Sequence, residues 1–541
     1  MAILKTILFI LWVPFLFQGI AFWTHLWQKA DYRYDRTKTR LKLPSSRKLL
    51  TGRNQLIISL LLLLSLAPFS FLEAPVTIIA ILAYTYFAIE TGKNIQEREF
   101  VMPAFTFRAT SIFITALIIY TTATWSIFIY LNEWFVASIL GGSIILPLLV
   151  SLVVLISNPV FDQVKKAIIK RAIKKISSMN NILVVALAGS YGKSSIAHIL
   201  HDILESDLRA IKTPPHLTTD IGIARFILKE LTPEHEVLIA EVGAKRKEET
   251  FKITQMLSPH IGVLAGITSK DTAFLGSMRD VQEAHYELIQ ALPDKSLAIF
   301  NGDDEYTRAL FKHCKKAKRL YASDPLVETS PQKILFENAK SIPEGIELQI
   351  REKGCSEETL RISLIGEHAV SNVMGALTIA RELGIPYKSI KEALIETETL
   401  PRTLEIRRGI KDTVVIDDTG SSNLNGVISA LALLKKTKGR QKICIFQPIG
   451  ELGTLSEKIH KQIALLIAET CDVCIVTSVD NFSAMYNEAM ENGMKNKSFI
   501  CISDPHKALR KAQEVCDKDD IILLENPIPE KVRQGLLLNK K

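Results

Sequence analysis

Residues 186–200 read ALAGSYGKSSIAHIL, and this stretch decides how the second part of the chain folds. The run NILVVALAG that leads into it is aliphatic and β-branched, as in a buried strand, and KSSIAHILHDIL has the apolar spacing of an amphipathic helix. Free backbone amides at the start of a helix favour a phosphate group. The turn between strand and helix is a G-x-x-G-K-S-S sequence made of Gly189, Ser190, Tyr191, Gly192, Lys193, Ser194 and Ser195.

A simple flexible connection is the plainer interpretation of the same turn. A full phosphate-loop pattern has glycine at position 187, where Leu187 stands, so the motif is a truncated form. An apolar strand, two glycines and a lysine in this order would have little use in a mere connection. We therefore expect residues 189–195 to bind ATP, with Lys193 reaching the β- and γ-phosphates and Ser194 holding Mg²⁺.

The chain from residue 181 onward alternates short apolar runs with stretches of helical spacing. Strand-like runs include EVLIAEVGA, IGVLAGIT and LAIFNGDD, and helical spacing follows them up to about 257 and across 280–291. Strands that alternate with helices indicate an α/β fold with a mostly parallel sheet.

Residues 1–160 are expected to form an α-helical membrane region with about five transmembrane helices. A bilayer core of about 30 Å requires about 20 apolar helical residues. A cleaved signal peptide is not expected, because the first run is long and lacks a clear cleavage site. The candidate spans are 4–23, 56–72, 75–90, 111–131 and 136–157.

The charges between these runs predict their orientation. Residues 28–54 contain nine Lys and Arg, 91–110 contain three and 161–175 contain six, whereas the other two gaps carry only Glu73 and Glu133 as charges. Basic loops stay on the cytoplasmic side of a membrane. The pattern predicts a multi-pass protein of the cell membrane, with its N-terminus outside and its later domains in the cytoplasm.

Residues 161–180 repeat apolar side chains at helical spacing and place lysines on the other face. This basic amphipathic linker helix has two interpretations. It could lie on an anionic lipid leaflet, or it could connect two domains with a solvated basic face.

The distribution of charge and cysteine narrows the class of protein. The net charge of +9 belongs to residues 1–180, with 19 Lys and Arg against 8 Asp and Glu, while the rest has 47 against 49. A nucleic-acid partner is not expected, since the soluble part carries no basic excess. All seven cysteines follow residue 300, and the pair Cys471 and Cys474 has no second pair to complete a zinc site, which indicates buried thiols of a reducing compartment.

Several segments after residue 180 resemble, in order, those of the Mur ligases, and most closely the MurF type. The resemblance implies a P-loop Mur-ligase central domain over 181–399 and a Rossmann-like C-terminal domain over 400–541. It rests on GSYGKSS, IAEVGAKRKEE, LGSMRDVQEAHYELI, FNGDDE, IGEHAVSNVMGALTIARELGI, LPRTLEIRRG with VVIDDTGSSN, and PIGELGTLSEKIHKQI.

The resemblance also implies a reaction and roles for single residues. In this family ATP phosphorylates a carboxylate, and an amine then attacks the acyl phosphate to give an amide. Glu241 matches a Mg²⁺-binding glutamate, Asn372 an adenine contact, Arg402 a phosphate contact and Asp418 a ribose contact. From the residues alone, Asn372 could equally lie on a helix surface, and Arg402 and Asp418 could form an interdomain salt bridge.

Two positions depart from the family pattern at the implied metal site. Asp271 stands where the family has a histidine ligand, which would keep oxygen ligation suited to Mg²⁺. His285 stands at the catalytic position of a carbamylated lysine, and an imidazole there loses a negative charge. DDTGSSNLN and LLENPIPEK also replace the family's acceptor-side sequences, and the membrane spans replace the UDP-sugar-binding domain.

These features predict a membrane-anchored, ATP- and Mg²⁺-dependent MurF-like ligase of cell-wall precursor synthesis. Its partners would be ATP, a UDP- or lipid-linked muramoyl peptide that bears the carboxylate, and an amino-acid or dipeptide amine. Two alternatives stay open. One is a ligase like poly-γ-glutamate synthetase, and the other is a degenerate, non-catalytic Mur-like membrane scaffold, which the residues at 271 and 285 favour.

Overall fold

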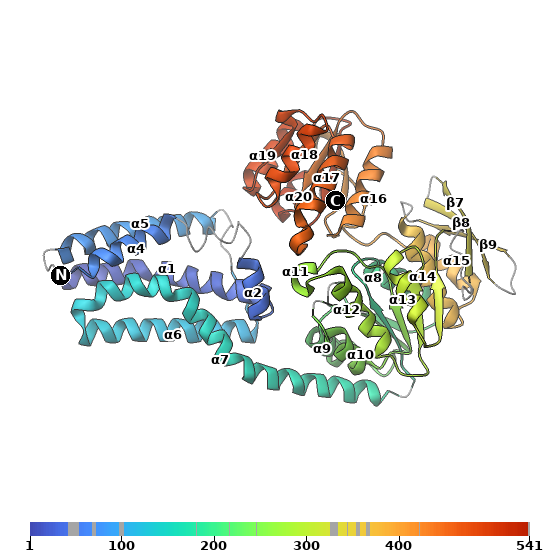
Figure 1. Cartoon of the computed structure of the whole chain (residues 1–541), viewed down its shortest axis with the longest axis horizontal. Coiled ribbons are helices and arrows are strands. Elements are labelled where there is room, and N and C mark those ends of the chain that lie inside the picture. Colours follow the sequence, from blue (N-terminus) through green and yellow to red (C-terminus); the bar gives the residue numbers. More distant parts are fainter. Residues whose placement is uncertain are drawn as a thin grey trace. The chain divides into compact units, whose positions relative to one another are not determined.

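A computed structural model describes the chain from residue 1 to 538, apart from 42–52, 68–71, 97–101, 180, 216, 245, 325–333, 343–344, 353–356, 364–367 and 421. The chain divides into two compact units, Met1–Lys166 and Ala167–Lys541. Figure 1 shows the helical first unit in blue and cyan, and the mixed second unit in green to red.

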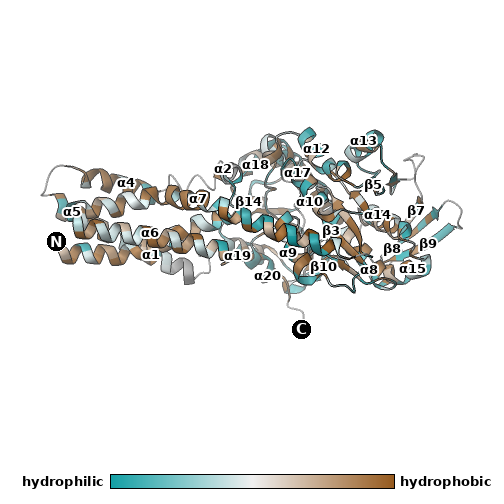
Figure 2. Ribbon diagram, turned by 90° about the horizontal axis from the view of Figure 1, so that it is seen from below, coloured by the Kyte–Doolittle hydropathy of each residue, from teal (hydrophilic) through white to brown (hydrophobic). Residues whose placement is uncertain are grey.

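Long apolar helices make up the first unit (Figure 2). Four helical stretches are long and apolar enough to cross a membrane, namely Ala2–Lys29, Glu73–Gly92, Phe107–Tyr130 and Asn132–Ser177. They correspond to four of the five predicted spans. The run at 56–72 forms only a shorter helix, and its residues 68–71 lie outside the described residues. The elements are α1 (Ala2–Lys29), α2 (Tyr34–Leu41), α4 (Arg53–Ser65), α5 (Glu73–Gln96), α6 (Phe107–Tyr130), η2 (Asn132–Trp134) and α7 (Phe135–Ser177).

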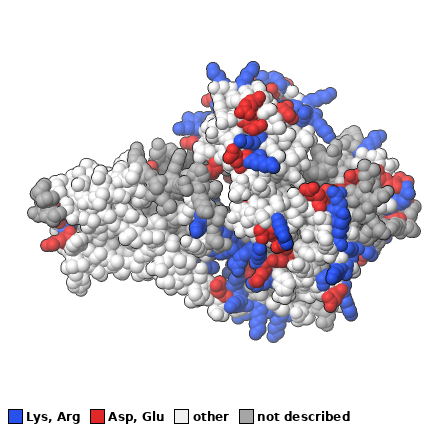
Figure 3. Space-filling view, in the orientation of Figure 1, with Lys and Arg blue, Asp and Glu red and all other residues white. Residues whose placement is uncertain are grey.

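The helical unit has an apolar exterior, and its largely apolar interior contains hydrogen-bonded polar side chains. Inside it, Trp12 Nε1 donates to Ser143 Oγ at 3.0 Å, and the hydroxyls of Ser143 and Tyr84 lie 2.7 Å apart. Figure 3 shows few charged side chains on its described surface, in contrast to the second unit. A bilayer requires this arrangement, because polar groups inside it must be satisfied within the protein. The four long apolar helices thus indicate membrane anchoring.

Helix α7 continues from the last apolar span through the predicted linker, over 43 residues. Ala172 and Ile176 are buried in a core that includes strand residues of the second unit, and Lys175 Nζ donates to the carbonyl of Leu228 at 3.0 Å. The second half of the apolar face, at Ala172 and Ile176, therefore packs on protein, which agrees with the linker interpretation, whereas Val164 in the first half is exposed. A contact of this segment with a lipid leaflet stays a prediction.

The second unit begins with a six-stranded parallel sheet in the order β2-β3-β1-β4-β5-β6. One face packs on α8, α14 and α15, and the other on α9, α10, α12, α13 and the end of α7. The strands are β1 (Leu183–Ala188), β2 (Ala210–Lys212), β3 (Val237–Glu241), β4 (Ile261–Leu264), β5 (Leu297–Asn301) and β6 (Lys318–Tyr321). The helices are α8 (Lys193–Glu205), α9 (Asp220–Glu230), α10 (Glu249–Leu257), α11 (Thr272–Leu275), α12 (Met278–Gln290), α13 (Glu305–His313), α14 (His368–Glu382) and α15 (Tyr387–Glu396).

A small antiparallel sheet of β7 (Ile334–Ile342), β8 (Gly345–Glu352) and β9 (Glu357–Ile362) shares its core with α14 and α15. It adds a layer beyond the helices that cover the first face of the parallel sheet. The sequence patterns described above did not predict this sheet.

The last part of the chain forms a second six-stranded sheet in the order β10-β11-β15-β12-β13-β14. Only the edge strand β10 is antiparallel to its neighbour. Two parallel sheets flanked by helices confirm the predicted fold class. The strands are β10 (Glu405–Arg408), β11 (Val414–Asp418), β12 (Lys442–Phe446), β13 (Val473–Val476), β14 (Phe499–Cys501) and β15 (Ile521–Glu525), and the helices are α16 (Leu424–Lys436), α17 (Ser456–Thr470), α18 (Phe482–Glu491), α19 (Pro505–Val515) and α20 (Glu530–Leu536), with the short turns η3 (Ile410–Asp412), η4 (Gly453–Leu455) and η5 (Asn496–Ser498).

Candidate active site

The turn between β1 and α8 has the backbone that a phosphate loop requires. Gly189 and Gly192 have φ values of 141° and 83°, and Gly192 caps α8 in the left-handed region. The Ser190 amide donates to the carbonyl of Gly266 at 2.6 Å, which fixes the turn against the segment after β4. A Cβ on Gly189 would lie 2.9 Å from Gly266 backbone atoms, so only glycine fits there. The amides at the start of α8 therefore remain a place for phosphate oxygens.

Lys193 and Ser194 open α8 and lie beside Glu241, at the carboxyl end of β3. Lys193 Nζ donates to the carbonyl of Gly189, so this ammonium group folds back over the turn. Ser194 Oγ donates to Glu241 Oε2 at 2.7 Å, and Glu241 is 2% exposed. Burial raises the pKa of Glu241, while Lys193 and then the Ser194 hydroxyl oppose the rise. A buried carboxylate beside a serine hydroxyl supplies hard oxygen ligands, which fits Mg²⁺.

The other predicted metal ligand, Asp271, occupies a strained position. It is the residue before α11, it has a φ of 72°, and its side chain is 7% exposed. Within the described residues, no group of three or more His, Cys, Asp or Glu side chains is arranged to hold a metal ion. The structure therefore brings Ser194 and Glu241 together, and a metal contact by Asp271 stays a prediction.

His285 lies on α12 with its imidazole buried against the phosphate loop. Its Nε2 lies 3.3 Å from Ser190 Oγ, and its side chain is 2% exposed. Burial, and secondarily the charge of Lys193, lowers its pKa to about 3. The imidazole is thus neutral at physiological pH and cannot supply negative charge at this position.

Tyr191 and Asp304 form a second support of the loop, and Asp304 was not among the predicted site residues. Tyr191 OH donates to Asp304 Oδ2 at 3.1 Å, and the same oxygen accepts from the Ile267 amide at 3.2 Å. A Cβ on Gly266 would lie 2.2 Å from the Tyr191 ring. The Tyr191 side chain thus braces the turn. The signal for Asp304 was its place in FNGDDE, directly after a strand.

Asn372, on α14, lies beside the phosphate loop although it is far away in sequence. A Cβ on Gly192 would lie 3.0 Å from Asn372 Oδ1. Because α14 packs closely on α8, this amide reaches the edge of the candidate nucleotide site. An adenine contact by Asn372 stays a prediction.

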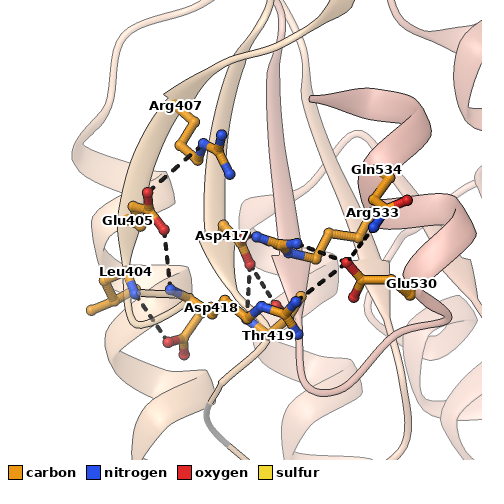
Figure 4. A network of polar contacts seen from close by, with 10 residues as sticks. Leu404, Glu405, Arg407, Asp417, Asp418, Thr419, Glu530, Arg533 and Gln534 are labelled. Carbon is orange, nitrogen blue, oxygen red and sulfur yellow. Dashed lines mark hydrogen bonds and ion pairs between the residues drawn. The ribbon is translucent and has the colours of Figure 1, made fainter. Parts of the chain in front are cut away.

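Arg402 and Asp418 lie in a polar network of the C-terminal domain, in which Figure 4 labels Asp418. Arg402 has a φ of 66°, and its guanidinium pairs with Glu530 on α20 at 3.2 Å. Asp418 Oδ1 accepts from the Leu404 amide at 3.1 Å, and Asp418 is 1% exposed. Neighbouring Asp417 pairs with Arg533 at 2.7 Å. Here Arg402 and Asp418 stabilise the entry to this domain, and their predicted nucleotide contacts stay predictions.

A phosphate loop on a parallel sheet, followed by a second Rossmann-like sheet, defines a nucleotide-binding α/β protein. Residues 187–380 match the Mur ligase middle domain, and residues 404–525 match the Mur ligase, glutamate ligase domain. The chain belongs to the Mur ligase family, whose members are ATP-dependent amide ligases.

The chain is similar to UDP-N-acetylmuramoyl-tripeptide–D-alanyl-D-alanine ligases. It is 27% identical to that of Buchnera aphidicola subsp. Baizongia pistaciae over 321 residues, which cover 59% of this chain and 67% of the relative. It is 24% identical to that of Escherichia coli over 280 residues, which cover 52% of this chain and 61% of the relative. Long apolar helices stand in place of the relatives' first domain.

Two solved structures have a similar fold. MurF from Acinetobacter baumannii matches with a TM-score of 0.60 and 20% identity, over 68% of this chain and 80% of that one. MurF ligase from Thermotoga maritima, in complex with ADP, matches with a TM-score of 0.57 and 20% identity, over 69% and 83%.

Proposed function

We propose that this chain is a membrane-anchored ligase that uses Mg²⁺ and ATP to join a carboxylate to an amine, in the manner of MurF. The observation that carries the proposal is the phosphate loop with Ser194 bonded to buried Glu241 at 2.7 Å, on the fold of the Mur ligase middle domain. The helix N-terminus, the lysine and a carboxylate at one sheet edge are the parts that phosphoryl transfer requires.

Each part has a stated task in this reaction. The amides at the start of α8 bind the β- and γ-phosphates, and Lys193 swings from the Gly189 carbonyl to neutralise charge on the transferring phosphoryl group. Ser194 and Glu241 would hold Mg²⁺, which supplies charge neutralisation at the phosphates. The substrate carboxylate attacks the γ-phosphorus and ADP leaves. The amine then attacks the acyl carbon, loses a proton and releases phosphate, giving the amide.

We propose a muramoyl peptide as the carboxylate substrate and an amino acid or dipeptide as the amine, by analogy with the relatives' names. The membrane helices would serve a substrate linked to lipid, since the family's first domain is replaced by them. We further propose the cytoplasm for the ligase domains and the outside for the N-terminus, because the segment that leads into the ligase domains is rich in lysine and basic segments stay in the cytoplasm.

The test is Mg²⁺-dependent ADP release by the full-length protein in detergent, with a panel of muramoyl peptides and amines. Wild type should release ADP only when both substrates are present, and Lys193→Ala should reduce the rate at least 100-fold. Lys170→Ala, on the exposed face of α7, is the matched control and should be as active as wild type. Failure of ATP to bind at millimolar concentration would refute the proposal.

A non-catalytic scaffold is the second candidate, and neutral, buried His285 favours it. An imidazole with a pKa of about 3 provides no negative charge beside the phosphate loop. If the protein binds ATP but no acceptor pair causes ADP release, the scaffold is the better description. Turnover gained by His285→Lys in bicarbonate buffer would then identify this single position as the cause.

A further inference from the structure

Two carboxyl groups lie side by side at the carboxyl edge of the C-terminal sheet. Asp418 ends β11 and Glu525 ends β15, and these parallel neighbours pair in register, so their side chains project from the same face. Asp418 is 1% exposed and Glu525 is fully buried. Figure 4 shows Asp418 at this edge.

Hydrogen-bond donors are scarce around Glu525. Both of its carboxylate oxygens are buried and have no hydrogen-bond partner among the described residues, although the nearby Asn526 amide favours the ionised form. Asn526 is itself fully buried, and its Oδ1 also lacks a partner in the described part of the chain, while its Nδ2 donates to the carbonyl of Gln447 at 2.7 Å. Buried acceptors are normally satisfied, so the two unpartnered carboxylate oxygens of Glu525 require an explanation.

Asp417 is a buried acid of the same domain whose hydrogen bonds and ion pair give it a structural role. Its side chain projects from the opposite face of β11, where Arg533 Nε donates at 2.7 Å and Thr419 donates from both its amide and its hydroxyl. Glu525 has no such cation among the described residues. The groups that face it are the acid of Asp418 and the thiol of Cys444 on β12. Burial and the neighbouring Asp418 raise the pKa of Glu525 well above its usual range, which favours the protonated form of this carboxyl group.

We propose that Glu525, Asp418 and Asn526 form a site for a monovalent cation, either a primary ammonium group or an alkali-metal ion. The unpartnered carboxylate oxygens of Glu525, beside the Asp418 carboxyl group, match both the N–H groups of an ammonium and the ligands of a hard metal ion. The carboxyl edge of a parallel sheet is also where α/β domains bind ligands. If the cation is an ammonium group, its carrier is the amine substrate; only that assignment rests on the proposed function.

The test uses the full-length protein in detergent without nucleotide, so it does not depend on ligase activity. Thermal unfolding is followed while methylammonium chloride or potassium chloride replaces tetramethylammonium chloride at constant ionic strength. Tetramethylammonium has no N–H group to donate to these oxygens and serves as the non-binding reference cation. A saturable rise in Tm of several degrees is expected at pH 8, and a smaller rise at pH 6, because the cation must displace the proton on Glu525. A response to methylammonium alone identifies an ammonium site, and one to potassium alone identifies a metal site.

Two variants make the result specific. Glu525→Gln should abolish the rise in Tm. Glu525→Asp keeps the carboxyl group and should show a weaker rise, and it provides a second test if Glu525→Gln does not fold. Glu514→Gln, on the exposed face of α19, is the matched control and should respond as wild type does. No saturable response to either cation, or an equal response in Glu525→Gln, would overturn the proposal. Loss of ATP turnover with an intact cation response would refute only the ligase function.

Discussion

Replacement of Glu241 by glutamine should raise the stability of the protein and lower its activity, because burial of this carboxyl group destabilises the fold while the group is expected to hold Mg²⁺. Burial raises its pKa. A carboxyl group with a higher pKa in the native state than in the unfolded state binds more protons when native, so stability falls as pH rises through that interval. At neutral pH the ionised Glu241 therefore lowers the free energy of unfolding, and glutamine removes this penalty.

The contacts of Glu241 set the expected size of both effects. A buried polar group without its full set of partners costs about 1–3 kcal/mol, and glutamine Oε1 can still accept from Ser194. We expect Glu241→Gln to gain about 1 kcal/mol, which corresponds to a rise in Tm of roughly 2–4 °C for a domain of this size. Loss of a charged ligand of the Mg²⁺ ion should lower ATP turnover about 100- to 1,000-fold.

The assay is thermal unfolding of nucleotide-free protein in detergent, together with Mg²⁺-dependent ADP release. The stability gain should be present at pH 8 and should decrease as the pH is lowered, because protonation of the native carboxyl group removes the penalty. Glu230→Gln, on the surface of α9 and paired with Lys229, is the matched control and should change neither quantity. A lower Tm together with unchanged turnover would show instead that Glu241 is a structural side chain.

Three further outcomes follow from other parts of the structure. His285→Asn should remove a loss of stability at acid pH. A base whose pKa falls from 6.5 to about 3 on folding destabilises the native state as pH decreases below 6.5, by about 2 kcal/mol at pH 5. The free energies of urea unfolding at pH 7 and pH 5 should therefore differ less in the variant than in wild type. Gly192→Ala should cost about 1 kcal/mol and weaken ATP binding at least 10-fold by calorimetry, because of its φ of 83° and the nearby Asn372 amide, whereas Gly450→Ala has open space and should be neutral. Arg533→Met should destabilise the C-terminal domain by about 3–5 kcal/mol in chemical unfolding, since it leaves Asp417 buried and unpaired, and an effect below 1 kcal/mol would contradict this.

Much of the fold could be predicted because its signals are local in sequence. The strand, glycine turn and helix around Lys193 carry their own periodicity, and the structure has β1 and α8 there. Four apolar runs were long enough to be recognised as spans by length alone. The fifth, at 56–72, was overestimated because its α-helix within the described residues, Arg53–Ser65, is short.

The site could be predicted where a local motif or the family resemblance gave a residue its role. Ser194 and Glu241 are 47 residues apart, and the Mg²⁺ roles expected for both implied that they would lie close together, which agrees with the hydrogen bond between them. The contact of Tyr191 with Asp304 spans 113 residues and left no trace in the spacing of either segment. The ion pair of Arg402 with Glu530 could not be predicted from the sequence either, since it depends on how α20 packs.

The amino-acid sequence by itself determined the strand, turn and helix of the phosphate loop, the alternation of strands and helices after it, and four of the apolar spans, because backbone propensity and hydrophobic period act over a few residues. Tertiary structure alone decided which buried groups have partners. It buried Ala172 and Ile176 of α7 in the core of the second unit, kept His285 neutral through burial, and paired Arg533 with Asp417, while the Glu525 carboxyl group accepts no hydrogen bond from the described residues. The physical reason is that desolvation and pairing of charge depend on which distant segments meet, and a linear pattern does not contain that information.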